Sequence, residues 1–286
     1  REAFECFRWM QNSSIAPDSV TFICTLKSCA MLGSFDKGLE IHAQIMKFGL
    51  LEKDILIGNA LVDMYVKCGM LLEAQKVFNK LLVRDEVSWN ALIAGYTQKG
   101  QGKEALECFR CMRNEGLSPD GITFISVLKA CGSTGLVDFG KVIHEEILRK
   151  GLLAKDVVLG NALVDMYAKC GALSKARIVL DMLPARDIVS WSALIAGYAQ
   201  KGQGHEALEC FGQMQMEGLS PDEVTFICAL KACGSIGAID KGMKIHDAIV
   251  NRGMLENHIS LSNALLDMYV KCGLLEKAQR VLEEIP

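Results

Sequence analysis

Apolar residues along this chain recur at helical spacing, in pairs of short segments. Within residues 86–120, four apolar residues are spaced to share one face of a first helix: Trp89, Leu92, Ile93 and Tyr96. Gly100 and Gly102 interrupt the pattern, and a second apolar stripe follows: Ala105, Leu106, Phe109 and Met112. No segment sustains strand-like alternation of apolar and polar residues, so the pattern predicts an all-α fold without a sheet.

The same pair of helices returns along the whole chain with a period of 102 residues. GNALVDMYVKCGML at residues 58–71 reappears almost unchanged at 160–173 and at 262–275. The period divides into units of 31, 35 and 36 residues, each of which is predicted to form two helices. The unit boundaries are 1–18 (partial), 19–54, 55–85, 86–120, 121–156, 157–187, 188–222, 223–258 and 259–286 (partial).

A two-helix hairpin of this size is too small to bury its own apolar stripe. It must stack on its neighbours, and a small constant rotation from unit to unit turns such a stack into a superhelix with a concave face. The sequence therefore predicts one solenoid of helix-turn-helix repeats over residues 1–286. The repeated phrase recurs because each copy must present the same face to the same kind of neighbour.

Charge and cysteine content limit which partners and which cross-links the chain is expected to have. The chain carries 31 basic and 34 acidic residues, so no overall positive charge draws it to nucleic acid or to acidic membranes. The 12 cysteines fall largely into sets 102 residues apart, one such set being Cys68, Cys170 and Cys272. One cysteine at the same place in each repeat is typical of buried free thiols in a reducing compartment, and not of a disulfide framework.

No targeting or membrane segment is apparent. No apolar run approaches the roughly 20 residues that a membrane-spanning helix needs, and no signal or transit peptide is visible. Because residues 1–10 already follow a helical pattern, we interpret the sequence as a piece of a longer protein.

Candidate catalytic and metal-binding residues do not converge. Cys108 and Cys111 form a CxxC without the preceding proline of a zinc deaminase, and we interpret them as a helical pair on a buried stripe. His42, His144 and His246 recur at 102 residues, which would place them far apart in a solenoid, unable to share a metal. His144-Glu145-Glu146 lacks the second histidine of a zinc-protease helix. We therefore expect a non-catalytic chain without cofactor or metal.

The unit lengths and phrases resemble the pentatricopeptide repeats of the plant PLS subfamily, in which P, L and S motifs alternate. VSWNALIAGY marks a P unit, VTFICTLKSC an L unit and ALVDMYVKCG an S unit. The resemblance covers essentially the whole chain: partial P at 1–18, L at 19–54, 121–156 and 223–258, S at 55–85 and 157–187, P at 86–120 and 188–222, and partial S at 259–286. It implies a right-handed superhelical solenoid. Tetratricopeptide repeats, uniform in length, would not alternate in this way.

The resemblance also implies a function. Members of the family bind single-stranded RNA, about one base per repeat, in mitochondria or chloroplasts. Many PLS members serve C-to-U editing through C-terminal extensions that end in a cytidine-deaminase-like domain, and such a domain would lie beyond Pro286. L motifs are implied as docking sites for accessory proteins, the multiple organellar RNA editing factors.

Residue by residue, the resemblance assigns base reading to the fifth and last residues of each unit. The matching pairs are Asn59/Asp85, Asn90/Asp120, Asn161/Asp187 and Ser192/Asp222, with Asn263 in the last unit. Asn with Asp implies U, with C tolerated, and Ser with Asp implies G. The L units carry Ile23, Ile125 and Ile227, which offer a base no hydrogen bond, and His258 departs from the pattern. The implied target is roughly U-U-N-U-G-N-Y. As an alternative, each Asn or Asp is a helix cap.

Two further sets complete the expected interface. The second residues of the units would flank the bases by apolar contact, or merely pack between repeats: Leu56, Val87, Ile122, Val158, Val189 and Val224. Lys67, Lys169 and Lys271, the thirteenth residues of the S units, would neutralise phosphates and make binding salt-sensitive.

A protein-binding scaffold is the main alternative to an RNA adaptor, because helical solenoids often hold peptides and this chain is not basic. The pairs of polar residues that recur in register favour RNA over a peptide groove.

Overall fold

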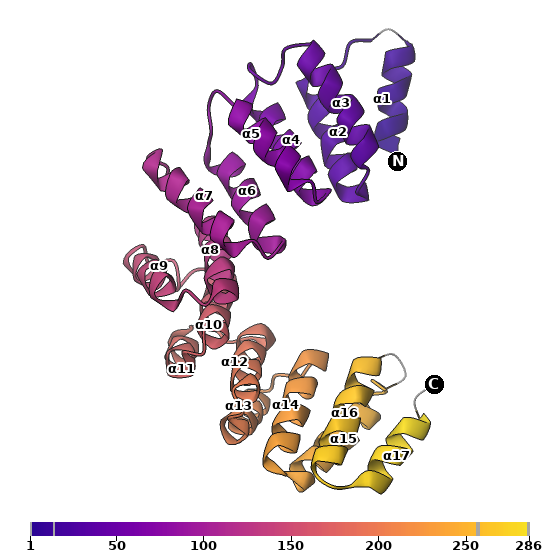
Figure 1. Ribbon diagram of the computed structural model, residues 1–286, viewed down its shortest axis with the longest axis vertical. Helices are drawn as coiled ribbons and strands as arrows, with labels where there is room; N and C mark the ends of the chain where they lie inside the picture. The colour runs from indigo at the N-terminus through magenta and orange to yellow at the C-terminus, as the bar shows by residue number, and fades with distance from the viewer. Residues whose placement is uncertain (1, 14, 256–257, 285–286) are drawn as a thin grey trace. The chain divides into compact units, whose positions relative to one another are not determined.

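The computed structural model describes residues 2–13, 15–255 and 258–284, and every regular element in these ranges is an α-helix. Residues 1 and 14 of the first partial unit and residues 285–286 of the last lie outside the described residues. Figure 1 labels the helices, which are α1 (Glu2–Asn12), α2 (Ser19–Leu32), α3 (Phe35–Lys47), α4 (Ile55–Lys67), α5 (Leu71–Lys80), α6 (Glu86–Gln98), α7 (Gly102–Asn114), α8 (Gly121–Thr134), α9 (Val137–Arg149), α10 (Val157–Lys169), α11 (Leu173–Met182), α12 (Ile188–Gln200), α13 (Gly204–Met216), α14 (Glu223–Ile236), α15 (Ile239–Asn251), α16 (Ile259–Lys271) and α17 (Leu275–Glu284).

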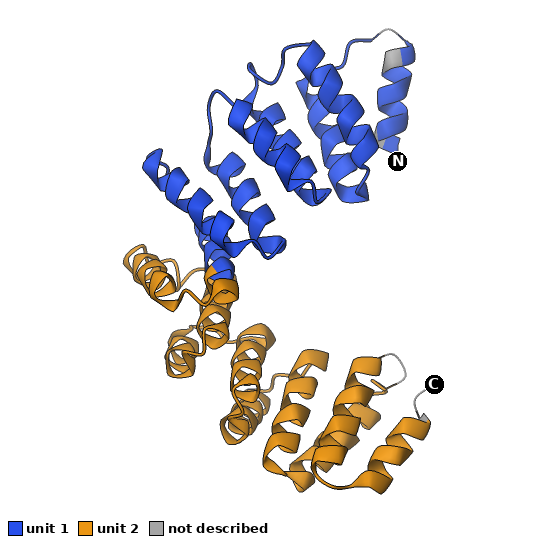
Figure 2. Ribbon diagram, viewed as in Figure 1, with its two compact units in different colours: residues 1–130 blue, residues 131–286 orange. Residues whose placement is uncertain are grey.

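The chain divides into two compact units, residues 1–130 and residues 131–286 (Figure 2). In the first unit, the first helices α2, α4 and α6 contact one another in order, and α5 contacts both α4 and α6. In the second unit the same arrangement runs through α10, α12, α14 and α16. Each unit is therefore a stack of helical hairpins in which the first helices form one layer. The predicted all-α fold of stacked helix-turn-helix repeats is confirmed.

Glycine and aspartate residues set the ends of the first helices. Asp222 accepts a hydrogen bond at the start of α14, and Gly237 ends that helix in the left-handed conformation, with φ of 68°. Its N–H donates to the carbonyl of Cys233, which satisfies one of the free carbonyls of the last turn. These first helices begin at residues 19, 55, 86, 121, 157, 188, 223 and 259, the first residues of the units delimited in the sequence.

The L and S units pack closely because a second-helix glycine faces a first-helix methionine. A Cβ on Gly38 would lie 2.6 Å from Sδ of Met64, and a Cβ on Gly242 would lie 2.7 Å from Sδ of Met268. Both methionine side chains are fully buried. Glycine at this position therefore lets the two helices approach, which explains why it recurs with the period of the chain.

The cysteines are free thiols, most of them buried or half-buried. Burial raises the pKa of Cys131 to about 12 and that of Cys233 to about 11, so both stay protonated at neutral pH. The expectation of burial was wrong for Cys6 and Cys24, which are exposed. Cys210, which corresponds to Cys6, is covered by Arg177 of the preceding hairpin, at 3.5 Å from its sulfur.

Among the described helices, none is both long and apolar enough to cross a bilayer.

Candidate functional site

Wherever the last residue of a unit is an aspartate, its side chain caps the first helix of the next unit. Asp85 accepts a hydrogen bond from the backbone N–H of Ser88 at 2.9 Å, and the Ser88 hydroxyl approaches the Asp85 backbone N–H at 3.0 Å, which completes a capping box. Asp187 and Ser190 repeat this box. The capping interpretation is thus confirmed for these two aspartates, and the cap uses only Oδ1 of each carboxylate.

The second partner is the fifth residue of the same unit that the aspartate ends. The amide nitrogen of Asn59 donates to both carboxylate oxygens of Asp85 at 3.1 Å. Asn161 donates to Oδ2 of Asp187 at 2.9 Å, while Oδ1 of the same carboxylate holds the cap. Asn90 reaches Asp120 at 3.2 Å and 3.3 Å. The structure therefore brings the fifth and last residues of these units together.

Ser192 and Asp222 are joined through a third residue that the sequence analysis missed. Thr225 Oγ1 lies 2.6 Å from Oδ1 of Asp222 and 2.5 Å from Oγ of Ser192. A hydroxyl has one proton, and the carboxylate has none to give, so Thr225 donates to Asp222 and accepts from Ser192. The Ser192 proton is thereby used, and its hydroxyl oxygen is left as an acceptor.

The third residue of each P or L unit is the signal that would have revealed this contact. In the P and L units it is always a hydroxyl residue: Thr21, Ser88, Thr123, Ser190 and Thr225. The S units carry an apolar residue at the same position. Thr123 also donates to Oδ1 of Asn90 at 2.6 Å.

The Asn side chains differ in burial and in how completely they are bonded. Asn59 is 6% exposed and Asn161 is 8% exposed, and Oδ1 of each is buried without a hydrogen-bond partner among the described residues. A buried acceptor without a donor lowers the stability of the folded chain by about 1–3 kcal/mol. Such an atom therefore calls for an explanation, for example a ligand that supplies the missing donor. Asn263, by contrast, is exposed.

The carboxylates of these pairs are held in their charged form. Burial acts to raise the pKa of Asp120, but hydrogen bonds from Thr123 and Asn90 outweigh it and bring the pKa below its ordinary value. For Asp187, burial likewise acts to raise the pKa, and bonds from Ser190 and Asn161 lower it overall. Both side chains are therefore negatively charged acceptors at neutral pH.

The second residues of the units are exposed aliphatic side chains beside these pairs. Leu56 and Val87 are each 60% exposed, and Val158 and Val189 are 61% and 55% exposed. Ile122 and Val224 are exposed to a similar degree. Packing between repeats would bury such side chains, so this alternative does not account for them. Each Asn–Asp pair instead has an open apolar residue on either side.

The lysines expected at phosphates are engaged within their own helices. Lys67 lies 2.9 Å from Asp63, four residues earlier, and Lys169 lies 2.7 Å from Asp165. Lys271 and Asp267 form the third such pair at 2.7 Å. About half of each lysine side chain is exposed. A phosphate would therefore have to compete with a carboxylate at each of these positions.

The L units contribute no polar side chain at their fifth position. Ile23, Ile125 and Ile227 are half-buried. His258, the last residue of the third L unit, places Nδ1 2.8 Å from Oε2 of Glu223 and caps no helix through its side chain.

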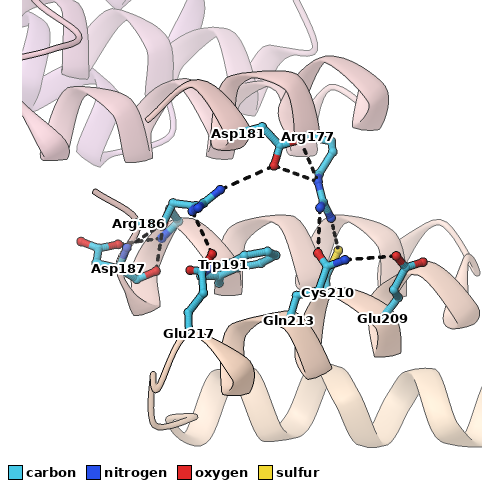
Figure 3. A network of polar contacts seen from close by, with 10 residues as sticks. Arg177, Asp181, Arg186, Asp187, Trp191, Glu209, Cys210, Gln213 and Glu217 are labelled. Atoms are coloured by element: carbon cyan, nitrogen blue, oxygen red, sulfur yellow. Dashed lines mark hydrogen bonds and ion pairs between the residues drawn. The ribbon is translucent and has the colours of Figure 1, made fainter. Parts of the chain in front are cut away.

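The arginine that precedes the last Asp of each S unit forms a salt bridge that was not predicted from the sequence. Arg186 lies 3.0 Å from Oε1 of Glu217, whose Oε2 accepts a 2.8 Å bond from the Trp191 indole (Figure 3). Arg84 and Glu115 repeat the contact at 2.8 Å, again with an indole donor, Trp89. The spacing of 102 residues between the two sets was the available signal. The network anchors the turn that presents Asp187.

The recurring histidines belong to the packing between L and S units. Nδ1 of His42 lies 2.7 Å from the Tyr65 hydroxyl, and His144 and Tyr167 repeat this contact at 3.1 Å. Burial, with a smaller effect from a nearby lysine, lowers the pKa of both histidines. The described residues contain no group of three or more potential ligands arranged to hold a metal ion.

Comparison with known families gives repeated matches along the chain. Residues 84–133 and 186–235 match the PPR repeat family, and residues 59–85, 122–152 and 261–286 match the PPR repeat. Together these segments cover more than half of the sequence.

Curated proteins of Arabidopsis thaliana are similar over nearly the whole chain. The pentatricopeptide repeat-containing protein At4g33990 is 37% identical over 97% of this chain and 34% of its own length. The chloroplastic protein At4g18520 is 36% identical over 100% of this chain and 46% of its own length. The mitochondrial protein At3g02330 is 35% identical, with 33% of its length covered. The chain thus spans between a third and a half of these relatives.

Among solved structures, the pentatricopeptide repeat protein PPR10 in complex with an 18-nucleotide psaJ RNA element has the same fold. The TM-score is 0.82 at 22% identity, over 99% of this chain and 42% of that one. The crystal structure of PPR10 from maize gives a TM-score of 0.67 at 24% identity, over 98% of this chain and 42% of that one. This likeness confirms the helical-repeat fold.

Proposed function

Since this chain belongs to the pentatricopeptide repeat family, we propose that it binds single-stranded RNA sequence-selectively, at about one base per repeat. The observation that carries the proposal is the contact between fifth and last residues, bordered by exposed aliphatic side chains. A base stacked between two such side chains would meet the polar pair with its edge. The PPR10 complex with RNA supports this interpretation, because it has the same repeat architecture.

The Asn–Asp pairs suit uracil. Oδ1 of Asn59 and of Asn161 is buried and lacks a donor in the free chain, and a rotation of the side chain that exposes Oδ1 would let it accept from N3–H of uracil. The second amide proton of the same Asn can be donated to O4 of the base. Cytosine can also pair with an amide, with its donor and acceptor exchanged. The proposed preference at Asn59/Asp85 and Asn161/Asp187 is therefore U, with C tolerated. We propose the same preference at Asn90/Asp120 because the two residue types are the same, although uracil would there have to displace the Thr123 hydroxyl from Oδ1 of Asn90.

The Ser192 site suits guanine. Its free groups are acceptors: the Ser192 hydroxyl oxygen, and Oδ2 of Asp222, to which no described residue donates. Guanine offers two donors on one edge, at N1 and N2, whereas adenine places an acceptor at N1. The proposed target, read from its 5′ end, is U-U-N-U-G-N-Y, with unread positions opposite Ile125 and Ile227.

We assign the chain more finely to the PLS type and to the recognition step of organellar C-to-U editing. The fixed order of 31-, 35- and 36-residue units supports the PLS assignment. Relatives named chloroplastic or mitochondrial support an organellar location. In this proposal the L units bind multiple organellar RNA editing factors, and any deaminase lies on a further domain of the full-length protein.

A mobility-shift titration tests the proposal. We expect the chain to bind an RNA carrying U-U-N-U-G-N-Y more tightly than a scrambled RNA or the equivalent DNA. Changing the G to A should weaken binding by the unmodified chain. The Ser192→Asn variant, which creates an Asn–Asp pair, should prefer U at that position instead. Equal binding of all three nucleic acids would favour the protein-binding scaffold, and an unchanged preference in the variant would refute the Ser192 assignment alone.

A further inference from the structure

The ninth residue of every L unit is an exposed lysine on the same helix face as the base-flanking residue. Lys27, Lys129 and Lys231 lie seven residues after Val20, Ile122 and Val224. Residues seven apart in a helix lie on one side, two turns from each other. Each lysine therefore stands about 10 Å along the helix from an exposed aliphatic side chain that borders the base row.

These three lysines have no carboxylate partner. No acidic residue stands three or four positions away from Lys27, Lys129 or Lys231 in the sequence. None of the three forms an ion pair with a described residue. Their charge is therefore available to a ligand without the loss of an existing contact.

The other units lack a free charge at this place. In the S units, position nine is an aspartate bonded to the lysine at position thirteen, as in Asp165 and Lys169 at 2.7 Å, so that the pair is neutral. The stem of Lys169 also lies over Gly132, with Cδ 3.3 Å from the position that a Cβ would take. In the P units, position nine is Ala94 or Ala196. Free positive charge on this face thus recurs once in every three repeats, in the L units.

We propose that Lys27, Lys129 and Lys231 bind the phosphates of single-stranded RNA, so that the L units anchor the backbone while the S and P units read bases. The inference rests on the proposed RNA-binding function. It also explains how a chain with a net charge of −3 attracts a polyanion, since an unpaired lysine stands on a first helix once in every 102 residues. The L units, with isoleucine at the reading position, then have a defined role in RNA binding.

The test is the salt dependence of binding by the triple variant Lys27→Gln/Lys129→Gln/Lys231→Gln. Each phosphate contact to a single strand contributes about 0.7 to the slope of log K against log salt concentration, so the variant should lose about 2 from that slope. Its affinity should fall by the same factor for matched and scrambled RNA. A triple Lys→Arg variant should keep the slope, because it keeps the charge.

The matched control is Lys67→Gln/Lys169→Gln/Lys271→Gln, which removes the same charge from paired lysines. We expect it to change the slope by less than the first variant, with both variants unfolding at the temperature of the unmodified chain. If the unmodified chain binds RNA and the L-unit variant keeps its slope and affinity, the inference is overturned and the proposed function stands. If the unmodified chain binds no RNA even at low salt, the proposed function fails first and the inference with it.

Discussion

At the scale of single residues, one aspartate side chain has two tasks. Oδ1 of Asp187 caps α12 through Ser190, and Oδ2 accepts from Asn161. From the sequence, capping and base reading are alternatives, because a sequence shows only that an Asp stands before a helix. The two oxygens of the carboxylate allow both. A substitution that keeps the cap but changes the second oxygen can therefore separate stability from recognition.

The variants Asp187→Ala and Asp187→Asn separate the two tasks. Alanine removes the cap and should lower the free energy of unfolding by about 1 kcal/mol, whereas asparagine caps as well as aspartate and should cost little. Both should weaken the preference for U opposite Asn161. Chemical denaturation and binding to RNAs that differ only at that base measure the two effects. A large loss of stability in Asp187→Asn would show that the charge, and not the cap, stabilises the turn.

At the scale of helices, the distance between neighbouring first helices depends on small residues. A Cβ on Gly197 of α12 would lie 2.9 Å from Cβ of Ala168 and 2.9 Å from Cδ2 of Leu173. Ala168 has no flexible end that can move away. Since α12 also carries Ser192, the contact at Gly197 helps to fix the position of Ser192 as well as the packing of the core.

Gly197→Ala should therefore be destabilising, by about 1–3 kcal/mol, as overpacked cores usually are. Gly212→Ala is the matched control: Gly212 lies within α13, and a Cβ there would meet nothing within 4 Å. It should be neutral or add up to about 1 kcal/mol, because alanine is the better helix former. Denaturation midpoints of the two variants measure the difference. Equal midpoints would show that α12 can shift without cost.

At the scale of the whole chain, stability is a sum over repeats and their neighbours, so a weak effect that recurs becomes measurable. The half-buried histidines His42 and His144 are such a case. Their pKa is lowered in the folded chain, by burial first and by Lys80 at His42 or Lys175 at His144 second. The unfolded chain therefore takes up protons below about pH 6.5 that the folded chain does not.

We expect the free energy of unfolding to change little around pH 7 and to fall as the pH drops below about 6.5 towards the lowered histidine pKa. A second loss should begin below about pH 4, where the lowered pKa values of Asp120 and Asp187 favour the folded state less and less. Urea denaturation at a series of pH values checks this. In the variant His42→Gln/His144→Gln, the slope between pH 6.5 and 5 should become shallower, and an unchanged slope would contradict the assignment.

The sequence by itself determined the architecture of this protein and the positions along it that matter. Repeat length, helical periodicity and the spacing of glycines are local or periodic properties, and a periodic sequence repeats its contacts as well. The positions of Asn59, Asp85 and Leu56 within their unit were therefore predictable.

Only the tertiary structure decided how those side chains are engaged. It showed that Thr225 links Ser192 to Asp222, that Arg186 and Glu217 anchor the turn before Asp187, and that Val87 is open and not packed. It also distinguished paired lysines such as Lys67 from unpaired ones such as Lys129. The physical reason is that hydrogen bonds and ion pairs join atoms some 30 residues apart, and their geometry depends on how one helix packs against the next.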